Sequence, residues 1–173
     1  MNITEKILAR ASEKNTVSPD DIVFAKVDKV MVHDVSGPGV LKVFDKLQKQ
    51  GIDISKLHDP SKVWIAEDHF VPSAEKISAE NIVKLSNFSK KYDIKKHFKY
   101  GMGQYGICHT LSHEEALVNP GDVYVGGDSH TNTTGALGAF ACGLGHTDVA
   151  YVLLNGEIWF KVPETYYFKL NGK

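Results

Sequence analysis

Apolar residues recur along the chain with two spacings, one typical of helices and one typical of strands. Apolar positions three or four residues apart predict amphipathic helices over residues 3–13, 40–50, 78–92, 112–118 and 146–154. Alternating or continuous apolar runs predict strands over residues 22–32, 63–66, 123–126, 157–162 and 166–170. Because strands alternate with helices, we expect an α/β fold with three α/β/α layers around a mostly parallel sheet.

Glycine-rich and polar segments separate these elements. Residues 36–39 predict a turn, residues 97–107 predict an irregular segment, and six glycines fall within residues 126–145. The dipeptide Asn171-Gly172 is typical of a tight hairpin turn, yet only Lys173 follows it. We therefore expect this sequence to be one piece of a longer polypeptide, with a frayed tail as the alternative.

Acidic and imidazole side chains come directly after three of the predicted strands. In chain order these groups are His33-Asp34, Asp68-His69 and Asp128-Ser129-His130. In open α/β sheets, ligand sites form beyond the carboxyl ends of the strands. We therefore expect these groups, which are far apart in the sequence, to meet in one crevice.

Charge and cysteine content exclude several functions. Twenty Lys and Arg against 21 Asp and Glu give a net charge of -1 without a clustered basic face, so neither nucleic acid nor an anionic membrane is an expected partner. No apolar run is long enough to span a membrane, and residues 1–10 are amphipathic and unlike a secretory signal. Two cysteines favour a reduced, cytoplasmic setting.

Histidine adds candidate chemistry, because eight histidines is a high count for 173 residues. An imidazole titrates near neutral pH and a carboxylate neighbour tunes it, which favours proton-transfer or metal chemistry. In the third group, Asp128 can fix an imidazole, Ser129 can bind a carboxylate and His130 can act as a general acid. The alternative for this group is a turn that caps a helix.

The cysteines and His97 have simpler interpretations. Cys108 and Cys142 are expected to be small buried hydrophobes, although Cys108-His109 could supply a nucleophile or a ligand. His97 follows two lysines and is expected to be solvated. The sequence has neither the HExxH nor the CxxC spacing of a self-contained zinc site.

Taken together and in order, these segments resemble the aconitase superfamily. The segments that carry the resemblance are Met31–Asp34, Glu67–Pro72, Gly106–His109, Gly127–Thr131, Gly135–Gly145, Thr147-Asp148 and Gly156–Pro163. Within the superfamily the chain is similar to the N-terminal part of the large subunits of 3-isopropylmalate dehydratase and homoaconitase, over essentially all of its length.

The resemblance implies a hydro-lyase that isomerises 2- and 3-isopropylmalate in leucine biosynthesis by removing water and adding it back. A 4Fe-4S cluster is the implied Lewis acid. A small, swivelling subunit is the implied partner, and it carries the base and part of the substrate specificity. By matching positions, His33 and Ser129 would bind substrate. The implied catalytic residues are Asp68, His69, His109, Asp128 and His130.

The cysteines depart from the family pattern. Neither Cys108 nor Cys142 matches the three cluster ligands of the family, which we expect beyond residue 173. Residues 1–173 would then be the N-terminal, incomplete portion of an aconitase-like iron–sulfur domain, and the isolated chain would be inactive. Three alternatives stay open: a homoaconitase or aconitase-type hydro-lyase, a non-enzymatic α/β binding module, and a mononuclear metal hydrolase that uses His33, His69, His109 and His130.

Overall fold

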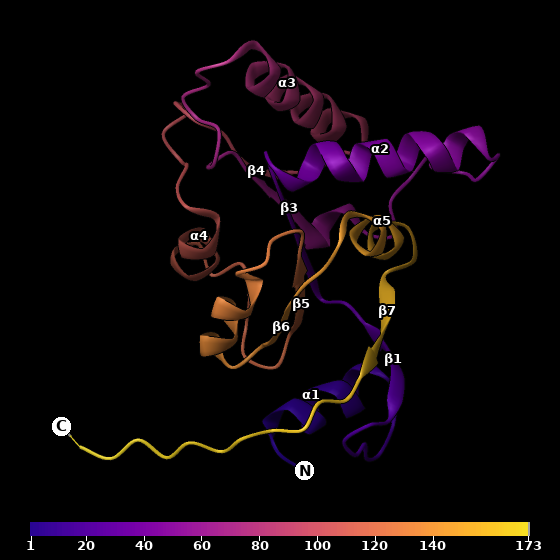
Figure 1. Cartoon of the computed structure of the whole chain (residues 1–173), viewed down its shortest axis with the longest axis vertical. Coiled ribbons are helices and arrows are strands. Elements are labelled where there is room, and N and C mark those ends of the chain that lie inside the picture. Colours follow the sequence, from indigo (N-terminus) through magenta and orange to yellow (C-terminus); the bar gives the residue numbers. More distant parts are fainter. Residues whose placement is uncertain (173) are drawn as a thin grey trace.

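A five-stranded parallel sheet lies at the centre of the computed structural model, which describes residues 1–172 (Figure 1). The strand order is β4-β3-β2-β5-β6, and every neighbouring pair is parallel. The elements in chain order are α1 (Ile3–Ala11), β1 (Ile22–Lys26), β2 (Lys29–His33), α2 (Ser36–Lys49), η1 (Pro60–Lys62), β3 (Val63–Ala66), α3 (Lys76–Lys91), β4 (Lys96–Phe98), α4 (Cys108–Glu114), β5 (Val123–Gly126), η2 (Thr131–Leu137), β6 (Phe140–Gly143), α5 (His146–Asn155) and β7 (Glu157–Lys161).

Two hydrophobic cores lie on opposite faces of this sheet, because side chains along a strand alternate between its faces. Val30, Ile65 and Val125 belong to the larger core, which also holds the buried faces of α2, α3 and α5. Their neighbours Trp64 and Tyr124 belong to the smaller core, which α4 and η2 complete. The predicted α/β class with a parallel sheet between helices is therefore confirmed.

The strand predicted over residues 22–32 is two strands in two different sheets. β1 pairs antiparallel with β7, and this ribbon lies beside α1 at the bottom of Figure 1. β2 joins the parallel sheet instead. Asp28 marks the break: its backbone N–H donates to the carbonyl of Val123, and its carboxylate accepts the N–H of Val123. The consecutive polar residues Asp28 and Lys29 interrupt the apolar alternation at this break, a signal that the prediction of one strand overlooked.

The turn predicted over residues 36–39 is wrong, because these residues form the first turn of α2. Pro38 is tolerated there, since the first turn of a helix has no intrahelical partner for its N–H groups. A Cβ atom on Gly37 would lie 2.2 Å from a methyl group of Leu85, which is fully buried in α3. The glycine therefore permits close packing of α2 against α3.

Three other boundaries differ from the sequence prediction. No strand was predicted at β4, which overlaps the segment expected to be irregular, or at β6, which lies in the glycine-rich stretch; both are short edge strands that the neighbouring strand stabilises by pairing. The helix expected over residues 112–118 begins earlier, at Cys108. Ser112 lies inside that helix, where its hydroxyl donates to the carbonyl of His109 and does not cap the helix.

The strand expected over residues 166–170 is also wrong, since residues 162–172 contain no helix or strand. Asn171-Gly172 forms no hairpin within residues 1–172, and Lys173 lies outside the described residues. A strand needs a partner for its N–H and C=O groups, and the alternating pattern alone does not supply one. Across residues 1–172, no helix has the length and apolar character needed to cross a membrane.

Gly143 offers a test of the close packing at the end of β6. A Cβ atom there would lie 2.4 Å from the backbone oxygen of Asp128. We expect Gly143→Ala to lower the free energy of unfolding by about 2–3 kcal/mol, because backbone cannot move aside cheaply. Gly135→Ala is the control, since nothing lies within 4 Å of its Cβ position. Equal urea midpoints for both variants would contradict this account.

Candidate active site

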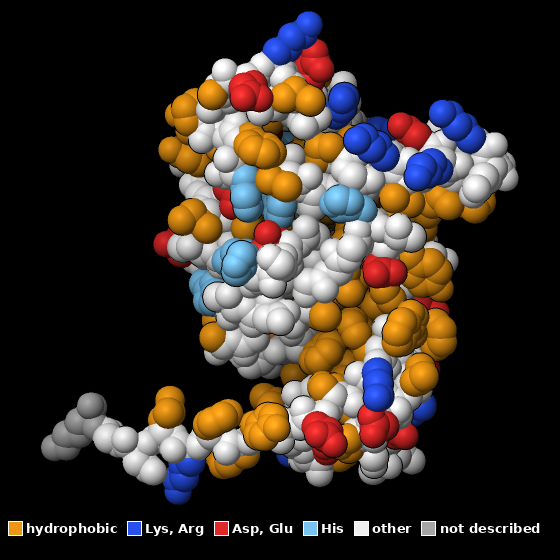
Figure 2. Space-filling view, in the orientation of Figure 1, with side chains coloured by type: hydrophobic (Ala, Val, Ile, Leu, Met, Phe, Trp, Pro, Cys, Tyr) orange, Lys and Arg blue, Asp and Glu red, His pale blue; other side chains and the backbone are white. Residues whose placement is uncertain are grey.

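The carboxyl ends of β2, β3 and β5 bring the three predicted groups together. These strands are neighbours in the sheet, so their last residues lie at one edge. Asp68 and Asp128 follow β3 and β5 at an even spacing from Trp64 and Tyr124, which places their side chains on the face that α4 covers. Figure 2 shows histidine side chains gathered around acidic ones on the visible face.

Asp68 and His69 form the first pair. His69 Nδ1 lies 2.7 Å from Asp68 Oδ1. The other oxygen of Asp68 accepts the backbone N–H of Cys108 at 2.7 Å, so the first residue of α4 is fixed to the end of β3. Both oxygens of this carboxylate therefore have partners, which fixes the orientation of the imidazole.

His109 and Asp128 form the second pair. His109 Nε2 lies 2.8 Å from Asp128 Oδ1, which also accepts the backbone N–H of His130 at 2.7 Å. His130 Nδ1 lies 3.4 Å from the same oxygen. α4 thus supplies one residue to each pair: the N–H of Cys108 to the first and the ring of His109 to the second.

The buried ring of His33 contacts both pairs. Its ring stacks on the ring of His69 with centroids 4.5 Å apart, and its Nε2 lies 3.4 Å from Asp128 Oδ2. Its Nδ1 accepts the N–H groups of Val35 and Ser36. Since Nδ1 is an acceptor, the proton of neutral His33 is on Nε2 and faces Asp128.

The surroundings separate the charge states of these groups. Burial alone would raise the pKa of Asp68, but the Cys108 N–H and His69 outweigh it, and the pKa is lowered. The pKa of His69 is raised, because its hydrogen bond and charge interaction with Asp68 outweigh its burial. Burial and the nearby His69 lower the pKa of His33. These shifts favour an ionised Asp68 carboxylate, a protonated His69 ring and a neutral His33 ring.

The second carboxylate is also held ionised. Burial opposes ionisation of Asp128, but the N–H of His130 and the ring of His109 donate to it, and its pKa is lowered. Exposure then divides the roles at the site. The side chain of His69 is 40% exposed and that of His130 is 78% exposed, whereas that of Asp68 is 5% exposed. The imidazoles of His69 and His130 therefore face solvent, while Asp68 and Asp128 are largely buried.

Known proteins are similar to this chain along its whole length. The model of the aconitase family (aconitate hydratase) matches residues 5–173. The chain belongs to the aconitase family. Proteins named 3-isopropylmalate dehydratase large subunit are 45% identical in Caldicellulosiruptor saccharolyticus, 44% in Thermodesulfovibrio yellowstonii and 46% in Aquifex aeolicus, each over 173 residues. All of this chain is covered, and it spans 38–39% of the length of these relatives.

Asp34 is a functional candidate in this aconitase-family chain that sequence reasoning placed in the crevice without giving it a role. Its carboxylate is fully buried and accepts the backbone N–H groups of His69 and Phe70 at 3.1 and 2.7 Å. It therefore fixes the loop that carries His69. The signal available in the sequence was an acidic residue directly after a buried strand, which needs partners when it is buried.

Glu67 and His97 form a buried pair on the other face of the sheet, so the prediction that His97 is solvated is wrong. His97 Nε2 lies 2.9 Å from Glu67 Oε1, and the His97 side chain is 4% exposed. Pairing of β4 with β3 turns this side chain inward, which the flanking lysines concealed. Burial raises the pKa of Glu67, whereas burial and the charge of Lys99 lower that of His97 to about 4.

The two cysteines do not fit the 4Fe-4S cluster that the family implies. A cluster is held by several thiolates. Cys108 is fully buried in the smaller core, and Cys142 packs against the larger core on the other face of the sheet. Burial raises the pKa of both thiols, and the charge of Asp68 adds to this for Cys108. The expectation that both would be small buried groups agrees with their burial, which is complete for Cys108 and partial for Cys142.

Removing Asp68 tests the first pair. We expect Asp68→Asn to lower the pKa of His69, because the carboxylate that stabilises its imidazolium form is lost. Titration of the imidazole signals by NMR measures this shift. Asp45→Asn, which removes a carboxylate from the exposed side of α2, is the control and leaves the His69 titration unchanged. An unchanged titration in Asp68→Asn would refute the pairing.

His97 gives the acid stability a predictable sign. Its pKa is about 4 in the folded chain, against about 6.5 for an unperturbed histidine, so the unfolded chain binds more protons between these pH values and stability falls on acidification. We expect His97→Gln to remove part of this loss, about 1–2 kcal/mol after solvent screening. Urea unfolding at pH 7 and pH 4 measures it. Lys96→Gln is the control on the same strand, and an equal acid loss in all three proteins would count against the burial of His97.

Proposed function

We propose that this chain supplies the proton-transfer half of an aconitase-type hydro-lyase site. The observation that carries the proposal is the meeting of two carboxylate–imidazole pairs, Asp68–His69 at 2.7 Å and Asp128–His109 at 2.8 Å, at one end of the sheet. Elimination of water requires protonation of the departing hydroxyl group, since hydroxide is a poor leaving group. A carboxylate that stabilises an imidazolium supports such a proton donor.

His69 is the proposed general acid. Its raised pKa keeps a proton on the ring near neutral pH, and its exposed ring can reach a bound hydroxyl group. Asp68 stabilises the imidazolium form of His69. Asp34 fixes the backbone of the loop by accepting the N–H groups of His69 and Phe70. In the reverse reaction, the neutral imidazole takes the proton back from the attacking water.

His109 and Asp128 form the second proton-handling pair, on the opposite side of His33. Their hydrogen bond fixes the ring of His109, and the lowered pKa of Asp128 keeps the carboxylate available as an acceptor. Ser129 and His130 are exposed, so we assign them to contacts with the substrate carboxylate. His33 is 1% exposed, which supports orientation of Asp128 more than direct contact with substrate.

The substrate, partner and cofactor follow from the relatives. Their name supports 3-isopropylmalate as substrate, in leucine biosynthesis, with homocitrate or citrate as the competing hydroxy acids. The words "large subunit" support a small-subunit partner, to which we assign the base. We assign the 4Fe-4S cluster to thiols outside this chain, because Cys108 and Cys142 do not fit it. A cytoplasmic location stays a prediction.

The mononuclear metal hydrolase has weaker support. The four histidines fall into two groups, His33 and His69 with their acids, and His109 and His130 with Asp128. His33 Nδ1 is occupied by two backbone N–H groups and its Nε2 carries the proton, so neither nitrogen is free for a metal ion. A stoichiometric zinc or manganese ion in the purified chain would reverse this judgement.

A chimeric protein tests the proposal. Residues 1–173 replace the corresponding part of the Aquifex aeolicus large subunit, which is assembled with its small subunit and assayed for isomerisation of isopropylmalate. We expect the chimera to be active and the Asp68→Asn and His109→Gln variants to lose about 10²–10⁴-fold in kcat, because each removes a proton-transfer group or its partner. The 173-residue chain alone is expected to show no turnover.

Two further measurements make the outcome decisive. Lys90→Gln, an exposed change on α3, is the control and keeps the activity of the chimera. Preference among isopropylmalate, homocitrate and citrate identifies the substrate. Turnover by the isolated chain would overturn the incomplete site, and full activity in Asp68→Asn would overturn the role of the first pair.

A further inference from the structure

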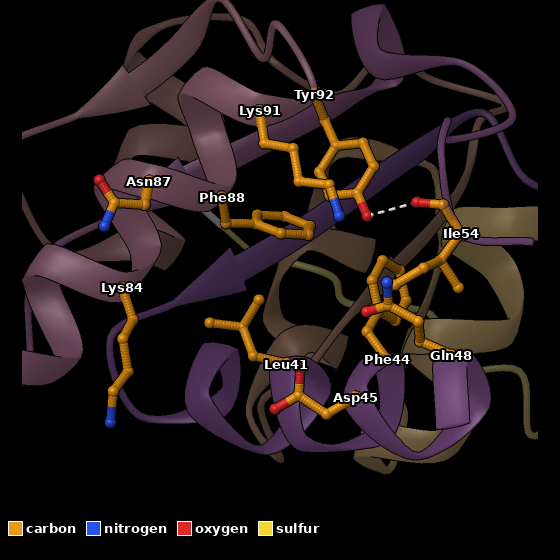
Figure 3. Close-up of a pocket in the computed structure, with 10 residues that line it drawn as sticks. All are labelled: Leu41, Phe44, Asp45, Gln48, Ile54, Lys84, Asn87, Phe88, Lys91 and Tyr92. Atoms are coloured by element: carbon orange, nitrogen blue, oxygen red, sulfur yellow. Dashed lines mark hydrogen bonds between the residues drawn. The ribbon is translucent and has the colours of Figure 1, made fainter. Parts of the chain in front are cut away.

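A cavity of about 460 Å³ lies between α2 and α3, on the face of the sheet opposite the histidine pairs (Figure 3). Its apolar lining comes from Leu41 and Phe44 on α2, Ile54 in the following loop, Phe88 on α3 and Tyr92 at its C-terminal cap. This volume is within the range of small-molecule sites, and apolar lining with a few polar groups is their usual composition.

The aromatic wall of this cavity is rigid. The rings of Phe88 and Tyr92 are 4.9 Å apart, and both contact Phe44, with centroids 5.8 and 6.0 Å away. The hydroxyl of Tyr92 donates to the carbonyl of Ile54 at 2.7 Å, which ties the loop to α3. The side chains of Phe44, Phe88 and Tyr92 are buried and already ordered. The cavity is therefore preformed, and binding a ligand loses little side-chain entropy.

Positive charge dominates the α3 side of the cavity. The amino group of Lys91 lies 4.7 Å from the centre of the Tyr92 ring, above the apolar lining, and Lys84 lies about two turns earlier on the same helix. Neither lysine forms an ion pair with any residue in the range 1–172. The single acidic residue in the lining is Asp45, on the α2 side.

We propose that this cavity binds a small carboxylic acid with a branched aliphatic or aromatic body. The body packs against the rings of Phe44 and Phe88, and this contact removes the apolar surface of the ligand from water. The carboxylate pairs with Lys91, whose ammonium group is already held at the edge of the apolar lining. An uncharged ligand of the same shape gains the first interaction and lacks the second.

The site does not depend on the proposed hydro-lyase function. Its lining residues lie on α2 and α3, and none of them belongs to the two histidine pairs. It is nevertheless joined to them by one element, because α2 begins at Ser36, whose hydroxyl accepts the N–H of His33. An occupant of the cavity therefore contacts the helix that starts under the histidine pairs.

Titration of the 173-residue chain with 4-methylpentanoate and phenylacetate, followed by backbone amide NMR, tests the proposal. We expect saturable shifts confined to α2, α3 and the loop around Ile54. The uncharged 4-methylpentanamide is expected to bind about three- to fivefold more weakly, the ratio that one exposed ion pair provides. Lys91→Gln is expected to weaken the binding of 4-methylpentanoate by the same factor. It is expected to change the affinity for 4-methylpentanamide by no more than about twofold.

The matched control is Lys90→Gln, which removes the same charge from the same turn of α3 at a residue outside the cavity lining. It is expected to leave both affinities unchanged. Absence of saturable shifts, equal affinity for the acid and the amide, or equal effects of the two lysine variants would overturn the proposal. Shifts centred on His69 and His130 would assign the carboxylate to the histidine pairs instead. Shifts that depend on protein concentration alone would identify the face as a contact between copies of the chain, which also overturns it.

Discussion

Buried carboxylates that must find partners are the constraint on which the site depends. An ionised acid out of water is costly unless hydrogen bonds satisfy it. Asp34 takes two backbone N–H groups, Asp68 takes an imidazole and the first N–H of α4, and Asp128 takes an imidazole and the N–H of His130. The bonds of Asp34 to His69 and Phe70, of Asp68 to Cys108 and of Asp128 to His109 each join two segments that are distant in the sequence. The requirement therefore fastens three loops and one helix to the same edge of the sheet.

The same arrangement separates groups that can exchange protons from groups that only orient them. His69 and His130 reach solvent, whereas the acids beneath them are largely enclosed. His33 is the link, because its ring stacks on His69 and its Nε2 faces Asp128. One buried imidazole, whose Nδ1 accepts two backbone N–H groups, therefore contacts both pairs.

The two faces of the sheet carry different chemistry because of the period-two alternation along its strands. One face ends in the histidine pairs under α4, and the other carries the Glu67–His97 pair and the aromatic cavity between α2 and α3. α2 connects the two, with Ser36 under His33 and Phe44 in the cavity wall. A helix of 14 residues spans about 20 Å, which is enough to join both places.

Local residue patterns determined the α/β class, the buried strands β3 and β5, and the position of each acid–imidazole group at a strand end, because apolar spacing and neighbouring residue types act over a few residues. Only the tertiary structure decided that Gly37 packs against Leu85 within a helix, that β4 turns His97 inward, and that Asp34 holds the loop of His69. It also left Tyr166–Leu170 without a strand partner. These outcomes depend on residues tens of positions away, and no local pattern encodes which distant N–H, ring or strand edge will be the partner.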